Sequence, residues 1–145
     1  FDTHQNQSAS LEPTLSSFDF MLNKLVQVLK DAGEFDNTLI VVYSDFGRTP
    51  KVNNSNGRDH WPTGGALMLG AGIDGGRAVG ATDSDLNAVN LIDPSTGVVT
   101  TDTSTGVQLN PTHLGGAVLN LCLGSSYGFR TYLDPIAAMV RLKSS

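Results

Sequence analysis

Three short polar clusters contain most of the residues in this chain that could do chemistry. They are Asp2-Thr3-His4, Ser44-Asp45-Phe46-Gly47-Arg48 and Asp59-His60-Trp61. Aspartate and histidine are ligands that a borderline divalent cation such as zinc accepts. The chain has three histidines, and two of them stand within two residues of an aspartate. We therefore interpret the three clusters as parts of one candidate metal site.

Each cluster also has a simpler interpretation when it is taken alone. Asp2 and His4 would point to the same side of an extended segment and could reach one cation, although an isolated pair is usually structural. Asp45 could ligate a metal, act as a base or cap the next turn. Arg48 could hold an oxyanion such as phosphate or sulfate, or it could form an ion pair with Asp45.

The remaining histidines and the cysteine differ in what they suggest. His60 could swing toward a metal from a glycine-flanked loop, with Asp59 orienting its ring, or it could be an ordinary surface histidine. His113 falls in the first turn of an expected helix, and we interpret it as structural. Cys122 has no partner cysteine in the chain, and we expect it to be a small buried side chain.

The elements that position the clusters follow from the apolar pattern. A helical stripe predicts an amphipathic helix that begins near Glu12 and ends near Ala32, with Pro13 in its first turn and Gly33 just beyond it. Its six members are Leu11, Leu15, Phe18, Leu22, Leu25 and Leu29. The apolar run from Thr38 to Tyr43 predicts a strand buried on both faces. A helix followed by a buried strand indicates a mostly parallel sheet in a three-layer α/β/α fold.

In such sheets the chemistry gathers beyond the carboxyl ends of the strands, which is where Asp45 falls. The rest of the chain predicts a long functional loop, a second buried strand, a glycine turn, a hairpin and two further helices. These are expected at residues 50–65, 66–70, 72–76, 90–100, from Asn110 and Pro111 to about Cys122, and at 132–142. Asn110 is the expected N-cap of the first of these helices.

Composition limits the class of protein. The 145 residues are 39% hydrophobic, which fits one domain, or a piece of a larger one, over residues 1–145. The net charge of −5 argues against a nucleic-acid partner. No apolar run approaches the roughly 20 residues that span a bilayer, so we expect no transmembrane segment in this chain. Because the chain starts at Phe1 with a ligand cluster, we expect that more of the protein lies upstream.

The order of the motifs resembles a known family. D-T-H-x-N, a long amphipathic helix, an apolar strand leading into S-D-F-G-R-T, and D-H in a glycine-rich segment resemble the bacterial domain-of-unknown-function family 1501. That family is similar to the alkaline phosphatase and sulfatase superfamily. The likeness covers about residues 1–80, and S-D-F-G-R-T is its most specific part.

The resemblance implies a metal centre at the carboxyl edge of a parallel sheet, with zinc, calcium or magnesium as the cation. It implies that Asp2, His4 and His60 are ligands of one metal and that Asp45 is a ligand of a second. Phe46 departs from the superfamily, which commonly has a histidine there, and Trp61 replaces a usual glycine.

The resemblance also implies a function. It predicts the C-terminal portion of an exported, periplasmic or cell-surface bacterial hydrolase of phosphate or sulfate esters, in which Arg48 helps to hold the anionic substrate. The catalytic nucleophile would lie in the remainder of the protein, upstream of Phe1. The alternative is a non-catalytic surface or assembly module that retains the fold, which Phe46 and the missing nucleophile favour.

Overall fold

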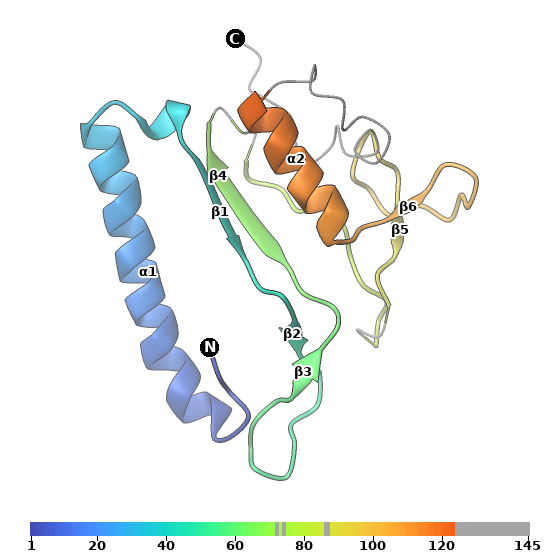
Figure 1. Cartoon of the computed structure of the whole chain (residues 1–145). Coiled ribbons are helices and arrows are strands. Elements are labelled where there is room, and N and C mark those ends of the chain that lie inside the picture. The colour runs from blue at the N-terminus through green and yellow to red at the C-terminus, as the bar shows by residue number, and fades with distance from the viewer. Residues whose placement is uncertain (72, 74, 86–87, 124–145) are drawn as a thin grey trace. The chain divides into compact units, whose positions relative to one another are not determined.

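The computed structural model describes residues 1–123 except positions 72, 74, 86 and 87 (Figure 1). Its chain divides into two compact units, Phe1–Ala71 and Gly72–Ser145, which are described here one at a time. The expectation of a single domain over residues 1–145 stays a prediction. In the described part, no helix is both long enough and apolar enough to cross a membrane.

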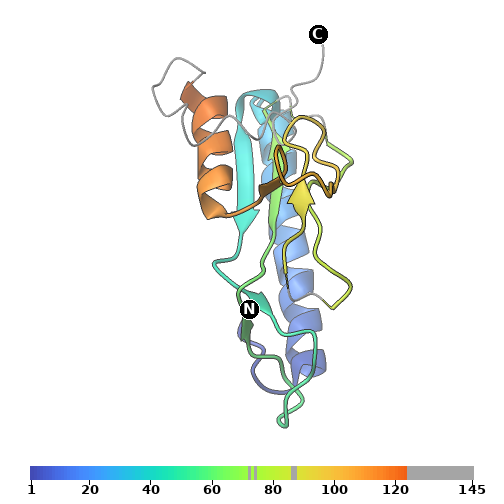
Figure 2. The ribbon, with the colours of Figure 1, turned by 90° about the vertical axis from the view of Figure 1, so that its right-hand side faces the viewer.

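The first unit consists of one long helix and two antiparallel strand pairs. Its elements are α1 (Gln7–Asp31), the 3-10 turn η1 (Phe35–Asn37), β1 (Leu39–Tyr43), β2 (Gly47–Arg48), β3 (His60–Trp61) and β4 (Ala66–Gly70). Both views show α1 running along the β1–β4 pair (Figures 1 and 2). The predicted helix and the two predicted long strands are therefore present.

The start of α1 differs from the prediction, whereas its end agrees. The helix begins at Gln7, five residues before Glu12, and Pro13 lies inside it. A residue outside the helix stabilises this early start, because the N–H of Gln7 donates to the carbonyl of Asn56 at 2.9 Å. At the other end, Gly33 has the expected positive φ of 72°. The N–H groups of Gly33 and Glu34 donate to the carbonyls of Lys30 and Leu29, so α1 closes with a Schellman motif.

The apolar stripe of α1 is only partly covered by the first unit. Leu11, Phe18, Leu22 and Leu29 are half-buried, whereas Leu15 and Leu25 are exposed. No residue of α1 is fully buried, and β1 is likewise half-buried rather than enclosed on both faces. The two-stranded sheet thus covers part of the stripe that the sequence marks for burial.

All strand pairs among the described residues are antiparallel. β1 pairs with β4 so that Leu39 faces Gly70 and Tyr43 faces Ala66. β2 pairs with β3, and in the second unit β5 (Leu91–Ile92) pairs with β6 (Val107–Gln108). Each sheet has two strands. The three-layer fold with a mostly parallel sheet therefore stays a prediction.

The second unit confirms the predicted hairpin and helix. Ile92 bridges to Val99 across a turn in which Gly97 has a φ of 76°, and Ile92 is fully buried. The helix α2 (Pro111–Leu123) starts with the predicted proline. The side chain of Asn110 accepts from the N–H of Thr112 at 2.9 Å, as an N-cap residue does. The predicted turn at 72–76 is only partly described, and the predicted helix at 132–142 lies outside the described residues.

The expectation that Cys122 is buried is wrong. Its side chain is exposed. Gly116 and Ala117 form the buried side of α2, whereas Gly115, Leu119 and Cys122 are all exposed. These three residues are spaced by four and three, so they lie on one solvent-facing stripe of the helix. Because the residues around Cys122 are nearly all apolar, the sequence did not indicate which side of the helix faces solvent.

Two turns with the same sequence pattern, D-x-S-T-G, hold the second unit's loops. In each, an aspartate side chain accepts hydrogen bonds from the backbone N–H and the hydroxyl of the serine two residues later, Asp93 from Ser95 and Asp102 from Ser104. Thr105 also donates to Asp102 at 2.8 Å. Bonds from the Ser104 and Thr105 hydroxyls lower the pKa of Asp102 to about 2.

We predict that replacing both hydroxyls, Ser104→Ala with Thr105→Val, raises the pKa of Asp102 toward the ordinary aspartate value of about 4. Because the folded-state pKa is depressed, the turn is stabilised above that ordinary value and loses this stabilisation as the pH falls toward 2. A carbon-detected NMR titration of the carboxyl group measures both values. Ser95→Ala in the sister turn is the control and should leave Asp102 unchanged. Equal pKa values in the wild type and the double variant would refute the prediction.

Candidate functional site

The first residues of the chain are held in place by a loop far along the sequence. The N–H of Arg58 donates to the carbonyl of Thr3 at 2.8 Å, and the N–H of Asn6 donates to the carbonyl of Ser55 at 3.0 Å. Gly57 is buried against the backbone of His4. A β-carbon on Gly57 would lie 2.0 Å from the His4 carbonyl oxygen, so only glycine allows this approach. We call residues 53–58 the clamp loop.

A short hairpin places the second and third polar clusters side by side. β2 and β3 pair so that Arg48 lies opposite His60, and the N–H of Thr49 donates to the carbonyl of Asp59 at 3.0 Å. Residues directly opposite each other on antiparallel strands project to the same face. The register therefore puts the Arg48 and His60 side chains next to each other on one face of the hairpin.

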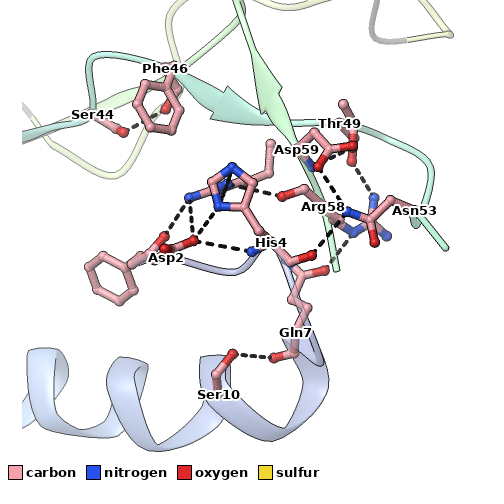
Figure 3. A network of polar contacts seen from close by, with 12 residues as sticks. Asp2, His4, Gln7, Ser10, Ser44, Phe46, Thr49, Asn53, Arg58 and Asp59 are labelled. Carbon is pink, nitrogen blue, oxygen red and sulfur yellow. Dashed lines mark hydrogen bonds and ion pairs between the residues drawn. The ribbon is translucent and has the colours of Figure 1, made fainter. Parts of the chain in front are cut away.

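Asp2, His4 and His60 come together at this point. Asp2 Oδ1 forms a short hydrogen bond with Nδ1 of His4, as Figure 3 shows. The rings of His4 and His60 have centroids 4.8 Å apart. The hydrogen bonds from the side chain and then the backbone N–H of His4 hold the pKa of the Asp2 carboxyl below its usual range, with Arg48 adding a smaller attraction.

Arg48 is the centre of this group. Its side chain is 18% exposed, and Nη1 lies 3.3 Å from both ring nitrogens of His4. Nη1 also donates to the Arg58 carbonyl and Nη2 to the Phe1 carbonyl, each at 3.0 Å. Nη2 is 3.7 Å from Asp2 Oδ1. Arg48 therefore pairs with Asp2, and the alternative ion pair with Asp45 does not form.

Phe46 packs directly against His60. Their ring centroids are 3.6 Å apart with an angle of 19° between the planes, which is a stacked arrangement. The guanidinium carbon of Arg48 is 5.3 Å from the centroid of the Phe46 ring, within the range of a cation–π contact. Phe46 thus fixes the plane of the His60 imidazole, although it cannot itself ligate a metal.

Asp45 and Asp59 lie apart from the histidine rings. Asp45 is exposed in the bend after β1, and no hydrogen bond or ion pair joins it to a residue that the structure describes. Asp59 is exposed too, and its carboxylate accepts a bond from Asn53 rather than from His60. Its interaction is thus with the clamp loop. His113 is hydrogen bonded at the start of its own helix, where Nδ1 accepts from the Asn110 N–H at 3.1 Å, and burial lowers its pKa.

The donor types at this point suit a divalent cation, but the arrangement is incomplete. Two imidazoles and a carboxylate are a zinc-like donor set. Over the described residues, however, no three His, Cys, Asp or Glu side chains surround a common point in a way that could hold a metal ion. Asp2 is bonded to His4, and Arg48 covers both nitrogens of the His4 ring.

Sequence reasoning missed the residues that hold the site together. Arg58 donates to Gln7 Oε1 at 2.7 Å and to the carbonyls of Thr49 and Pro50. Asn53 donates to the carbonyl of His4 at 3.0 Å. Thr3 is buried, and its hydroxyl has no hydrogen-bond partner among the described residues. The sequence signal that could have identified these residues is Gly57-Arg58, which stands directly before Asp59-His60 in an asparagine-rich loop.

Comparison with known proteins identifies the family. The family described as "Protein of unknown function (DUF1501)" matches residues 1–109, which include the whole candidate site. The chain belongs to this family. Neither the curated proteins nor the solved structures contain a match.

We predict that Gly57→Ala destabilises the protein by about 1–3 kcal/mol, the usual cost of forcing extra atoms into a packed position. The new methyl group would collide with the His4 carbonyl and push the N-terminal segment off the clamp loop. Chemical denaturation measures the change in the free energy of unfolding. Gly65→Ala is the matched control, because a β-carbon there meets nothing within 4 Å. Equal stability of the two variants would contradict the close approach.

Proposed function

We propose that this chain is the metal-binding portion of an alkaline-phosphatase-like or sulfatase-like hydrolase of phosphate or sulfate esters. The observation that supports it is the contact of Asp2 with His4 and of His4 with His60, because His4 and His60 are 56 positions apart in the sequence and still meet beside one arginine. The larger three-layer α/β/α fold, the superfamily and the export to the periplasm or cell surface are parts of the same proposal. They rest on the family resemblance.

In this proposal His4 and His60 hold the cation, with Asp2 as the acidic ligand, and the cation is zinc, calcium or magnesium. When bound, it would polarise an ester oxygen and stabilise the developing negative charge. Arg48 supplies a second positive group beside the same histidines, where it could orient an anionic substrate. Asp45, exposed after β1, remains the proposed ligand of a second cation, and Asp59 keeps the His60 segment in place through Asn53.

A non-catalytic module is the second candidate, and a specific observation favours it. Arg48 already contacts both ring nitrogens of His4 and lies near Asp2, which are the atoms that a metal would need. Phe46 stacks on His60 in the position where the superfamily commonly has a ligand. In that case the same residues form a self-contained polar cluster that stabilises a surface or assembly domain.

Metal content separates these two candidates. We predict that purified protein retains about one equivalent of a divalent metal and that His60→Ala loses it, because removing one imidazole leaves too few ligands. Elemental analysis by mass spectrometry measures the metal-to-protein ratio. His113→Ala is the control, since His113 lies in α2 and bonds only to Asn110 among the described residues. A wild type without stoichiometric metal would count against the metallohydrolase.

Turnover tests the enzyme directly. The protein at its full natural length is expected to hydrolyse an aryl phosphate or an aryl sulfate, and Arg48→Lys should reduce that activity by losing the planar two-pronged contact. Release of the coloured aryl alcohol gives the rate. Metal binding without turnover of either ester would favour the non-catalytic module.

A further inference from the structure

We propose that Asn53 is a positioning residue that fixes the two histidine-bearing segments relative to each other. The inference rests on the proposed function only in taking His4 and His60 as the groups that matter. The clamp loop that carries Asn53 bonds to the N-terminal segment through Ser55, Asn56 and Arg58, and Asn53 lies at its first position.

The side chain of Asn53 uses all of its hydrogen-bonding capacity. Nδ2 donates to the carbonyl of His4 at 3.0 Å and to Oδ1 of Asp59 at 2.9 Å. Oδ1 accepts from the N–H groups of Ser55 and Gly57 at 2.9 and 3.0 Å. An asparagine amide offers two N–H donors and one oxygen with two lone pairs, so no site on it is left over. Figure 3 shows Asn53 between the His4 and Asp59 segments.

The two donated bonds reach the two segments whose histidines meet. One goes to the main chain of His4 itself, and the other goes to Asp59, the residue next to His60. The two accepted bonds meanwhile shape the turn that brings Gly57 against the same His4 carbonyl. One half-buried amide therefore links the loop's own shape to the placement of both rings.

Only an amide of this length meets these demands. An aspartate at position 53 has the same shape but no N–H donors, so it would place its oxygens against the His4 carbonyl and the Asp59 carboxylate. A serine could still accept from a backbone N–H two residues on, as serines do in turns, but it is too short to reach both segments. Both substitutions therefore keep an acceptor for the loop's own N–H groups and remove the two donated bonds to the histidine segments.

The test compares Asn53→Asp with Asn54→Asp, an equal change of charge at the neighbouring exposed residue. Nitrogen–proton correlation spectra of the imidazole rings, recorded on folded protein without added metal, report the surroundings of each histidine. We expect the His4 and His60 resonances to move in Asn53→Asp and in Asn53→Ser, and to stay in place in Asn54→Asp. His113, in the other unit, should not move in any variant and serves as the internal reference.

Binding of Co(II), followed by its visible absorption, gives the second readout. Loss of a partner that orients a ligand typically weakens metal binding by roughly 10- to 100-fold, and we expect this for both Asn53 variants relative to Asn54→Asp. Unmoved His4 and His60 resonances in a folded Asn53→Ser protein would overturn the inference, even if Asn53→Asp failed to fold. If the wild type bound no Co(II), the proposed metal function would fail, while the ring resonances would still decide the role of Asn53.

Discussion

The site depends on the docking of an N-terminal segment against the clamp loop, and that docking depends on the missing side chain of Gly57. Any β-carbon there would overlap the carbonyl of His4. With it absent, the main chain bonds from Arg58 to Thr3 and from Asn6 to Ser55 can form together. Because Asp2 and His4 precede α1 while Arg48 and His60 follow β1, the polar clusters meet through this long-range contact together with the bonds that Arg48 makes to the N-terminal segment.

Charge then determines what the assembled group can hold. Arg48 is mostly buried, and a charge removed from water needs compensating partners. Its partners are the carbonyls of Phe1 and Arg58 and the nearby carboxylate of Asp2. A second cation beside His4 would be repelled by the guanidinium at short range. The position of Arg48 therefore decides whether this group is a metal centre or a polar cluster without a metal.

Local signals explain which parts of the fold could be predicted. The apolar spacing predicted α1, and Gly33 predicted where α1 ends. Asn110 and Pro111 predicted the start of α2. The first turn of α1 could not be predicted, because the Asn56 carbonyl that bonds to the N–H of Gln7 lies 49 positions away in the sequence. The pairing of Arg48 with His60 was hidden in a loop, since strands of two residues carry no periodic pattern. Residue types nominated Asp2, His4 and His60, but their metal role stays a prediction.

The exposed apolar residues bear on the proposed three-layer fold. Leu15 and Leu25 belong to the stripe that predicted α1, yet they remain exposed beside a two-stranded sheet. Leu15 and Leu25 are 47% and 46% exposed, so covering them fully would add roughly half of the 1.5–3 kcal/mol that complete burial of a leucine contributes. Further strands that covered them would therefore be stabilising. The antiparallel β1–β4 pair does not oppose this proposal, because large α/β sheets often carry an antiparallel edge strand. In such a sheet Tyr43 would still end β1 beside the polar clusters, at the edge where α/β proteins place their ligands.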